Sequence, residues 1–138
     1  MNLKRWALAT VAAFPVILVT DFLLHHVWLG EFYRATAQWW APETQMQSRM
    51  SFMFLGQSLG AALLALVYAR GYEPKRGRAL QGLRFGALIG ALLAVPCNLI
   101  SYVIYPYPAW LLVTWAVGMM VQVMLAGAAI GAVYRTGK

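Results

Sequence analysis

Charged side chains are scarce in this sequence, and acidic ones are the scarcest. Of 138 residues only 4 are aspartate or glutamate and 11 are lysine or arginine, so charged residues make up 11% of the chain. Soluble domains carry about 25% charged residues. A chain with so little charge and 62% hydrophobic residues does not belong to that class. Its composition indicates a membrane protein.

Cysteine is also nearly absent, and so are signatures of common enzymes. Cys97 stands alone, which excludes an intrachain disulfide and a CxxC metal or redox motif. The sequence contains no HExxH zinc motif and no phosphate-binding glycine loop. Both histidines, His25 and His26, fall in one segment, so a haem held by histidines from facing helices is not expected. We therefore predict a protein that is not an enzyme and has no cofactor.

Long hydrophobic runs are what the sequence does contain. Four of them, at 6–30, 46–69, 80–104 and 109–134, are each long enough to cross about 30 Å of hydrocarbon as a helix. The alternation typical of barrel strands is absent. The sequence thus predicts an all-α polytopic membrane protein, with four transmembrane helices in one domain over 1–138, an outer loop at 31–45 and a cytoplasmic loop at 70–79. A weak similarity between 14–23 and 95–104 leaves open two parallel-repeated helical hairpins.

Basic residues are distributed unevenly between the loops. They gather before the first run, around the loop at 70–79 and after the last run, as Lys4, Arg5, Arg70, Lys75, Arg76, Arg78, Arg84, Arg135 and Lys138. The positive-inside rule then predicts a bacterial inner-membrane protein with both termini in the cytoplasm. Contact with anionic lipid headgroups accounts for this charge, and we expect no nucleic-acid partner.

Glycines spaced four apart occur in three of the runs, at 56 and 60, at 82, 86 and 90, and at 127 and 131. Such spacing lets helix backbones approach closely in lipid. We expect these contacts to form within one bundle. The alternative is a homodimer through 80–104, or another membrane protein as partner.

The single aspartate lies inside the first run, in the stretch TDFLLHHVWLGE at 20–31. At about 100° per residue, Asp21 and His25 share one helix face, while His26 points away. An ionisable group at this depth usually faces the bundle interior or water. We therefore predict an Asp21–His25 pair that holds the first helix to the second and third. Alternatively, the pair belongs to a binding or transport path, whose further polar residues are Gln57, Asn98, Tyr102 and Gln122.

Soft side chains give a further hypothesis, a metal site. Three methionines share one helical face with Gln57, and we expect this stripe to face the bundle. Thioether, thiol and imidazole groups are what Cu(I) prefers. The candidate ligands are His25, His26, Met46, Met50, Met53 and Cys97. Methionine more commonly fills gaps between helices, so packing is the favoured interpretation.

Four stretches are similar to a group of small bacterial four-helix integral membrane proteins without an assigned function. They are DFLLHHVWLGEFY at 21–33, QWWAPETQMQ at 38–47, QGLRFGALIG at 81–90 and GAAIGAVYR at 127–135. The resemblance implies four helices and an inner-membrane setting, and it carries over no site residue. We expect a non-enzymatic protein with a partner-facing or structural role. The alternative is a small transporter or accessory factor for a proton, cation or metal ion that uses Asp21 and His25.

Overall fold

The computed structural model describes residues 2–73 and 78–134, and this part of the chain contains helices and no strand. Four helical segments, Leu3–Trp28, Met50–Arg70, Ala79–Ile104 and Ala109–Val133, are long and apolar enough to cross a membrane. The chain is therefore a multi-pass membrane protein, and the prediction of an all-α fold with four transmembrane helices is confirmed. Lys75, Arg76, Arg135 and Lys138, on which part of the charge argument rests, lie outside the described residues.

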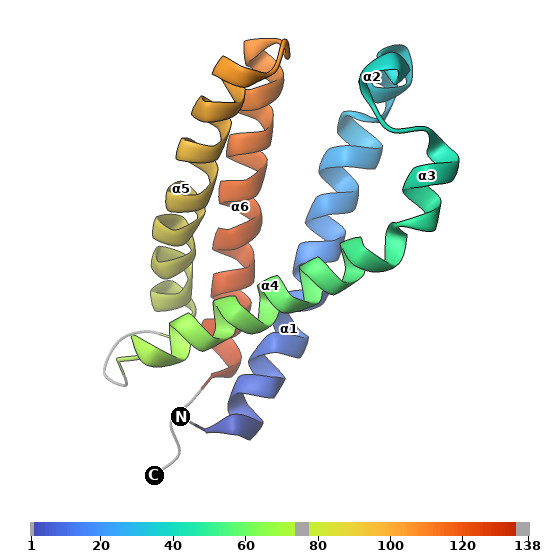
Figure 1. Ribbon diagram of the computed structural model, residues 1–138. Coiled ribbons are helices and arrows are strands. Elements are labelled where there is room, and N and C mark those ends of the chain that lie inside the picture. The colour runs from blue at the N-terminus through green and yellow to red at the C-terminus, as the bar shows by residue number, and fades with distance from the viewer. Residues whose placement is uncertain (1, 74–77, 135–138) are drawn as a thin grey trace.

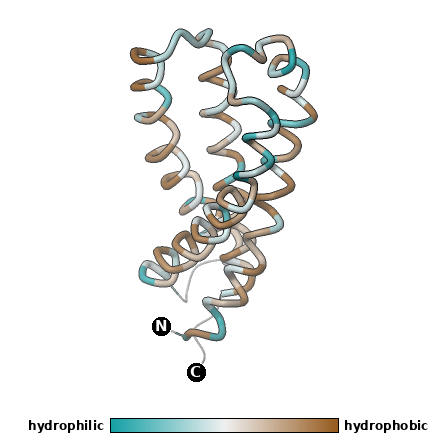
Figure 2. The backbone as a smooth tube through the Cα atoms, turned by 45° about the vertical axis from the view of Figure 1, so that its right-hand side comes forward, coloured by the Kyte–Doolittle hydropathy of each residue, from teal (hydrophilic) through white to brown (hydrophobic). Residues whose placement is uncertain are grey.

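The elements follow one another in a simple order. They are α1 (Leu3–Phe22), the π-helix η1 (Leu23–Trp28), α2 (Gly30–Ala35), the short 3-10 helix η2 (Ala37–Trp39), α3 (Glu43–Ser48), α4 (Met50–Arg70), α5 (Arg78–Ile104) and α6 (Ala109–Val133). Figure 1 shows the start of α1 and the ends of α4 and α6 at one end of the molecule, with α2 and the α5–α6 connection at the other. Figure 2 shows apolar residues along most of the long helices and polar ones in the segment between α1 and α4.

Helix α6 occupies the middle of the arrangement. It packs along α5 on one side and against α1 on the other, and α4 crosses α1 at a steep angle (Figure 1). Small side chains allow this crossing, because Ala9 and Ala13 of α1 and Ala61 and Ala65 of α4 are all fully buried. The indole N–H of Trp6 adds a hydrogen bond of 2.9 Å to the carbonyl oxygen of Ala62. The four long helices therefore do not form a closed bundle.

Glycines bring the backbones of α5 and α6 together. A Cβ atom added to Gly86 would lie 2.7 Å from the Cα atom of Met124, and one added to Gly82 would lie 2.8 Å from the carbonyl carbon of Gly127. Both distances are shorter than a carbon–carbon contact allows. This glycine face of α5 is thus covered by α6 of the same chain, which leaves no room for a homodimer through it.

The predicted helix over 46–69 is divided in two, because the chain turns at Arg49 between α3 and α4. The first half of α4 diverges from the other helices (Figure 1). As a result Met46, Met50 and Met53 are 46%, 39% and 43% exposed, and the prediction that the methionine stripe faces the bundle is wrong. Gln57 alone of that stripe turns inward, as described below.

Replacing Gly86 by alanine should separate α5 from α6, because the added methyl group meets backbone atoms that have nowhere to move. We expect a loss of about 1–3 kcal/mol in the free energy of unfolding, as for other overpacked sites. The measurement is equilibrium unfolding in mixed micelles of a mild detergent and dodecyl sulfate. Gly56→Ala is the matched control, since a Cβ atom there has nothing within 4 Å. Equal losses for the two variants would contradict this account of the α5–α6 interface.

Candidate functional site

The carboxylate of Asp21 joins three helices. Nε2 of Gln57 in α4 donates to Asp21 Oδ2 over 2.9 Å. Nε2 of Gln122 in α6 donates to the carbonyl oxygen of Ile17 over 3.0 Å and lies 3.5 Å from Asp21 Oδ1. The predicted polar clasp is therefore present, but it holds α1 to α4 and α6, whereas the sequence had indicated the second and third transmembrane helices.

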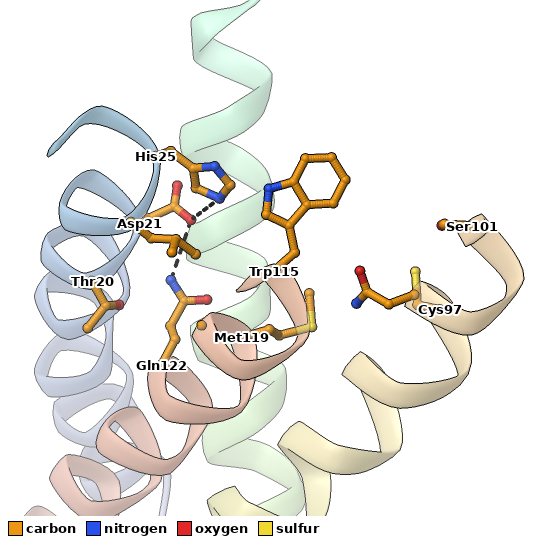
Figure 3. A pocket seen from close by; sticks show the side chains of 11 residues that line it. Thr20, Asp21, His25, Cys97, Ser101, Trp115, Met119 and Gln122 are labelled. Atoms are coloured by element: carbon orange, nitrogen blue, oxygen red, sulfur yellow. Dashed lines mark hydrogen bonds and ion pairs between the residues drawn. The ribbon is translucent and has the colours of Figure 1, made fainter. Parts of the chain in front are cut away.

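His25 lies one turn beyond Asp21 and points toward it (Figure 3). Its Nε2 atom is 3.8 Å from Asp21 Oδ1, and its Nδ1 atom is 2.7 Å from the hydroxyl oxygen of Tyr33. The same hydroxyl accepts a hydrogen bond of 2.8 Å from the indole N–H of Trp115. The predicted proximity of Asp21 and His25 is confirmed, and the structure adds Tyr33 and Trp115 to it.

The hydrogen-bond donors limit where the protons lie between Trp115, Tyr33 and His25. The indole N–H of Trp115 only donates, so the Tyr33 oxygen accepts from it. The Tyr33 proton can then go to His25 Nδ1, or the same oxygen can accept a second hydrogen bond from an Nδ1–H group. In the first arrangement His25 is a neutral imidazole with its proton on Nε2, the atom facing Asp21. In that arrangement Asp21 is the single charge of the network, and the 3.8 Å between His25 Nε2 and Asp21 Oδ1 is longer than a hydrogen bond.

A π-helix shapes the backbone at this point. In η1 the N–H groups bond five residues back, as shown by the 3.0 Å bond from Leu29 N to Leu24 O. The wider turn ends with Leu29 buried and Trp28 exposed, and it leads directly into α2, which carries Tyr33. Short π segments within α-helices are frequent at functional sites. The hydrophobic pattern of the sequence predicts a helix here but contains no signal for its π form.

Aromatic rings from two distant segments surround Tyr33. Trp40 lies edge-on to Tyr33 with ring centroids 5.1 Å apart, and Tyr107 stacks on Trp40 at 5.4 Å. Trp115 of α6 contacts both Trp40 and Tyr107. Burial raises the pKa of the Tyr33 hydroxyl above its ordinary value of 10.0, and the Asp21 charge acts in the same direction, while the hydrogen bond from Trp115 opposes them. We call these four rings, Tyr33, Trp40, Tyr107 and Trp115, the aromatic cap.

A cavity of about 350 Å³ lies beside Asp21 and His25, between α1, α5 and α6. In Figure 3, Asp21 and His25 project from one wall, Cys97 and Ser101 of α5 lie on the opposite wall, and Trp115, Met119 and Gln122 of α6 lie between them. Leu24, Asn98, Thr20 and Gly118 complete the lining. The cavity therefore presents one carboxylate, one imidazole, several neutral polar groups and an aromatic ring.

Not all residues of the predicted polar path belong to this site. Asp21, His25, Asn98 and Gln122 line the cavity, and Gln57 reaches it through its bond to Asp21. Asn98 directs its amide N–H to the carbonyl oxygen of Ala94 in its own helix, at 2.9 Å. Tyr102 is 58% exposed and does not line the cavity, so it lies apart from the other residues of the predicted path.

The candidate metal ligands are spread over the molecule. His26 is exposed and stacks on Phe22 with ring centroids 5.2 Å apart. Cys97 lines the cavity, whereas the three methionines are exposed on α3 and α4 and do not. Within residues 2–73 and 78–134, three or more His, Cys, Asp or Glu side chains nowhere gather as a metal site requires. The structure thus does not bring the candidate copper ligands together at one place.

A serine motif in α4 tests the expectation that catalytic signatures are absent. Residues 56–60, GQSLG, match the GxSxG pattern of serine hydrolases, contrary to that expectation. In those enzymes the serine occupies a sharp turn from a strand to a helix, whereas here the motif lies inside α4. The hydroxyl of Ser58 donates to the carbonyl oxygen of Phe54 over 2.8 Å. The pattern therefore does not form a nucleophile elbow.

Comparison with known proteins identified no family. No family model matches the chain, and no curated protein or solved structure is similar to it at a significant level. The resemblance to small four-helix membrane proteins is therefore supported only in its architecture, by the four long apolar helices.

Removing the hydroxyl group of Tyr33 should weaken the aromatic cap and change its response to alkali. Tyr33→Phe leaves the Trp115 N–H and His25 Nδ1 without their partner, at an expected cost of about 1 kcal/mol. The raised pKa adds stability that is complete below about pH 10 and is lost as the pH rises through the folded-state value. The free energy of unfolding should therefore fall less steeply above pH 10 in the variant, as measured by unfolding in mixed micelles at several pH values. Tyr105→Phe, at an exposed tyrosine, is the control, and identical pH profiles for Tyr33→Phe and the wild type would contradict the assignment.

Proposed function

We propose that this multi-pass membrane protein is not an enzyme and that it binds a proton or a small cation at Asp21, as a carrier or an accessory factor. One observation carries the proposal. Asp21 is the single acidic residue within the four membrane-spanning segments, and it borders a cavity of about 350 Å³. Intramembrane ionisable residues commonly mark ion or substrate pathways.

The hydrogen bonding of the carboxylate supports this proposal. Strong bonds to a carboxylate measure about 2.7–2.9 Å, and only the bond from Gln57 to Oδ2 is that short. The neighbours of Oδ1, Gln122 and His25, lie at 3.5 and 3.8 Å. An ionised aspartate at the centre of a bilayer costs about 2.5–3.5 kcal/mol. The protein itself gives Oδ1 no short hydrogen bond on the cavity side of the carboxylate. A proton or a cation at Oδ1 would therefore provide that interaction.

A structural or partner-facing role is the second candidate. It is supported by the contacts that Asp21 makes with other helices. The carboxylate and Gln122 connect α1 with α4 and α6, so the same residues serve to hold the helices in place. If this were their whole role, Asp21→Asn would reduce stability in detergent by about 1 kcal/mol and alter nothing else. Cation binding predicts a change in charge movement as well.

Charge movement on a pH jump is the measurement that tests the proposal. Proteoliposomes adsorbed on a solid-supported membrane should give a transient current when the pH is stepped, because the proton taken up at Asp21 moves within the low-dielectric region. We expect Asp21→Asn to abolish this current and Glu43→Gln, which removes the same charge from the exposed helix α3, to retain it. A wild-type current no larger than that of empty liposomes would overturn the proposal.

We further propose a bacterial inner-membrane location with both termini in the cytoplasm. The basic residues Lys4, Arg5 and Arg70 support it, because they lie at the end of the molecule where α1 begins and α4 and α6 end (Figure 1). The aromatic cap would then lie at the outer interface, where tyrosine and tryptophan are enriched.

The orientation is tested by the accessibility of single cysteines in intact spheroplasts. We expect a cysteine introduced at Gln38, in a Cys97→Ser background, to react with a membrane-impermeant maleimide. One introduced at Asn2 should react only after the membrane has been permeabilised. The reverse pattern would show that the termini lie outside.

A further inference from the structure

We infer that the cavity beside Asp21 accepts an organic ammonium ion with an apolar body, which donates an N–H to Asp21 Oδ1 and lies against the ring of Trp115. The inference rests on the proposed function and names the chemical class of the ligand. Its basis is the combination of charge, space and lining at one place in the fold.

The charge of the cavity is the first argument. Asp21 is the single carboxylate among the described residues that line it, none of them is a lysine or an arginine, and His25 is neutral when it accepts the Tyr33 proton. Of the two basic residues of α5, Arg84 is the nearer to the cavity along the sequence, and it lies 14 positions before Asn98, or roughly 20 Å along the axis. The cavity therefore has one unit of negative charge and no protein cation to balance it.

The position of the unoccupied side of the carboxylate is the second argument. Asp21 Oδ2 is taken by Gln57 at 2.9 Å, whereas Oδ1 has its neighbours at 3.5 and 3.8 Å. Those neighbours, Gln122 and His25, also line the cavity. A donor inside the cavity thus finds an anionic oxygen with spare accepting capacity, and a charged N–H forms the shorter and stronger type of bond with it.

The size and lining of the cavity distinguish an organic cation from a metal ion. A volume of about 350 Å³ falls within the range of small-molecule sites, roughly 300–1,000 Å³. Calcium takes about 6–8 oxygen ligands, and the lining supplies one carboxylate with scattered neutral groups. No cluster of three His, Cys, Asp or Glu side chains occurs in the described part of the chain, so a transition metal also lacks its ligands.

The apolar part of the lining fits the body of such a ligand. Trp115, Met119 and Leu24 line the cavity next to Asp21 and His25. An indole ring attracts a cation through its π face, and Trp115 is held in place by its N–H bond to Tyr33. Ser101 on the opposite wall (Figure 3) and Asn98 of the same helix offer neutral polar groups. A ligand with an ammonium group at one end and an aromatic or aliphatic body therefore matches both walls.

Cys97 provides a built-in reporter for the test. It is the single cysteine of the chain, it is exposed, and it lines the cavity. In the full-length protein in mild detergent, the rate of its alkylation by N-ethylmaleimide is measured with and without 2-phenylethylammonium. The neutral analogue 2-phenylethanol, which has nearly the same shape, is the matched probe. With the ammonium ion at about ten times its Kd the rate should fall about tenfold, because the free fraction varies as 1/(1 + [L]/Kd).

Three outcomes decide the matter. Protection by the ammonium ion and not by the alcohol, lost in Asp21→Asn and kept in Glu43→Gln, supports the inference. Equal protection by both probes, or protection by neither, overturns it, and the wild-type comparison stands even if Asp21→Asn does not fold. The proposed function is judged separately by the pH-jump current. An Asp21-dependent current without ammonium protection would refute the ligand class alone, ammonium protection without a current would refute proton uptake alone, and the absence of both would refute both proposals.

Discussion

Hydrocarbon supplies no water to solvate a carboxylate, and the arrangement of this protein depends on how it meets that constraint at Asp21. Two glutamine side chains from different helices reach toward the group, and one bonds it at 2.9 Å. Because α1 and α4 also cross through buried alanines, the polar contact and the close packing hold the same helices together. The carboxylate is nevertheless satisfied on one side only. This asymmetry makes it a candidate site as well as a structural link.

The aromatic cap extends the same network away from the hydrocarbon. Tyr33 connects His25 to Trp115, so the segment between α1 and α4 is attached to α6 through hydrogen bonds that begin at His25, one turn beyond Asp21. The two contacts of the Tyr33 oxygen measure 2.7 Å to His25 Nδ1 and 2.8 Å to the Trp115 indole nitrogen. The rings of Trp40 and Tyr107 limit contact of the network with solvent. The polar site is thereby built from groups that fix one another's orientation.

The architecture and part of the site were predictable from the sequence, for physical reasons. Four long apolar runs require helices, because a membrane leaves few other ways to pair the backbone. The spacing of Asp21 and His25 placed them on one face, and helical geometry alone brought them together. The pairing with Gln57 and Gln122 depends on which helices cross, and a single sequence does not contain this information. Tyr33 escaped prediction because a π-helix precedes it, and the methionine stripe failed because the turn at Arg49 directs the first half of α4 away from its neighbours.

Helix α5 takes no part in the hydrogen bonds that join the other long helices at Asp21, and this has a consequence for the cavity. This helix is held through the glycine contacts of residues 82–90 with α6, before the stretch that lines the cavity, and none of the hydrogen bonds to Asp21 comes from it. The α5–α6 hairpin thus meets the α1–α4 pair mainly through α6. The space in front of the carboxylate is bounded on its far side by Cys97 and Ser101 of α5, which take no part in the clasp. A substitution on that wall would therefore change the shape of the cavity and leave every hydrogen bond to Asp21 in place.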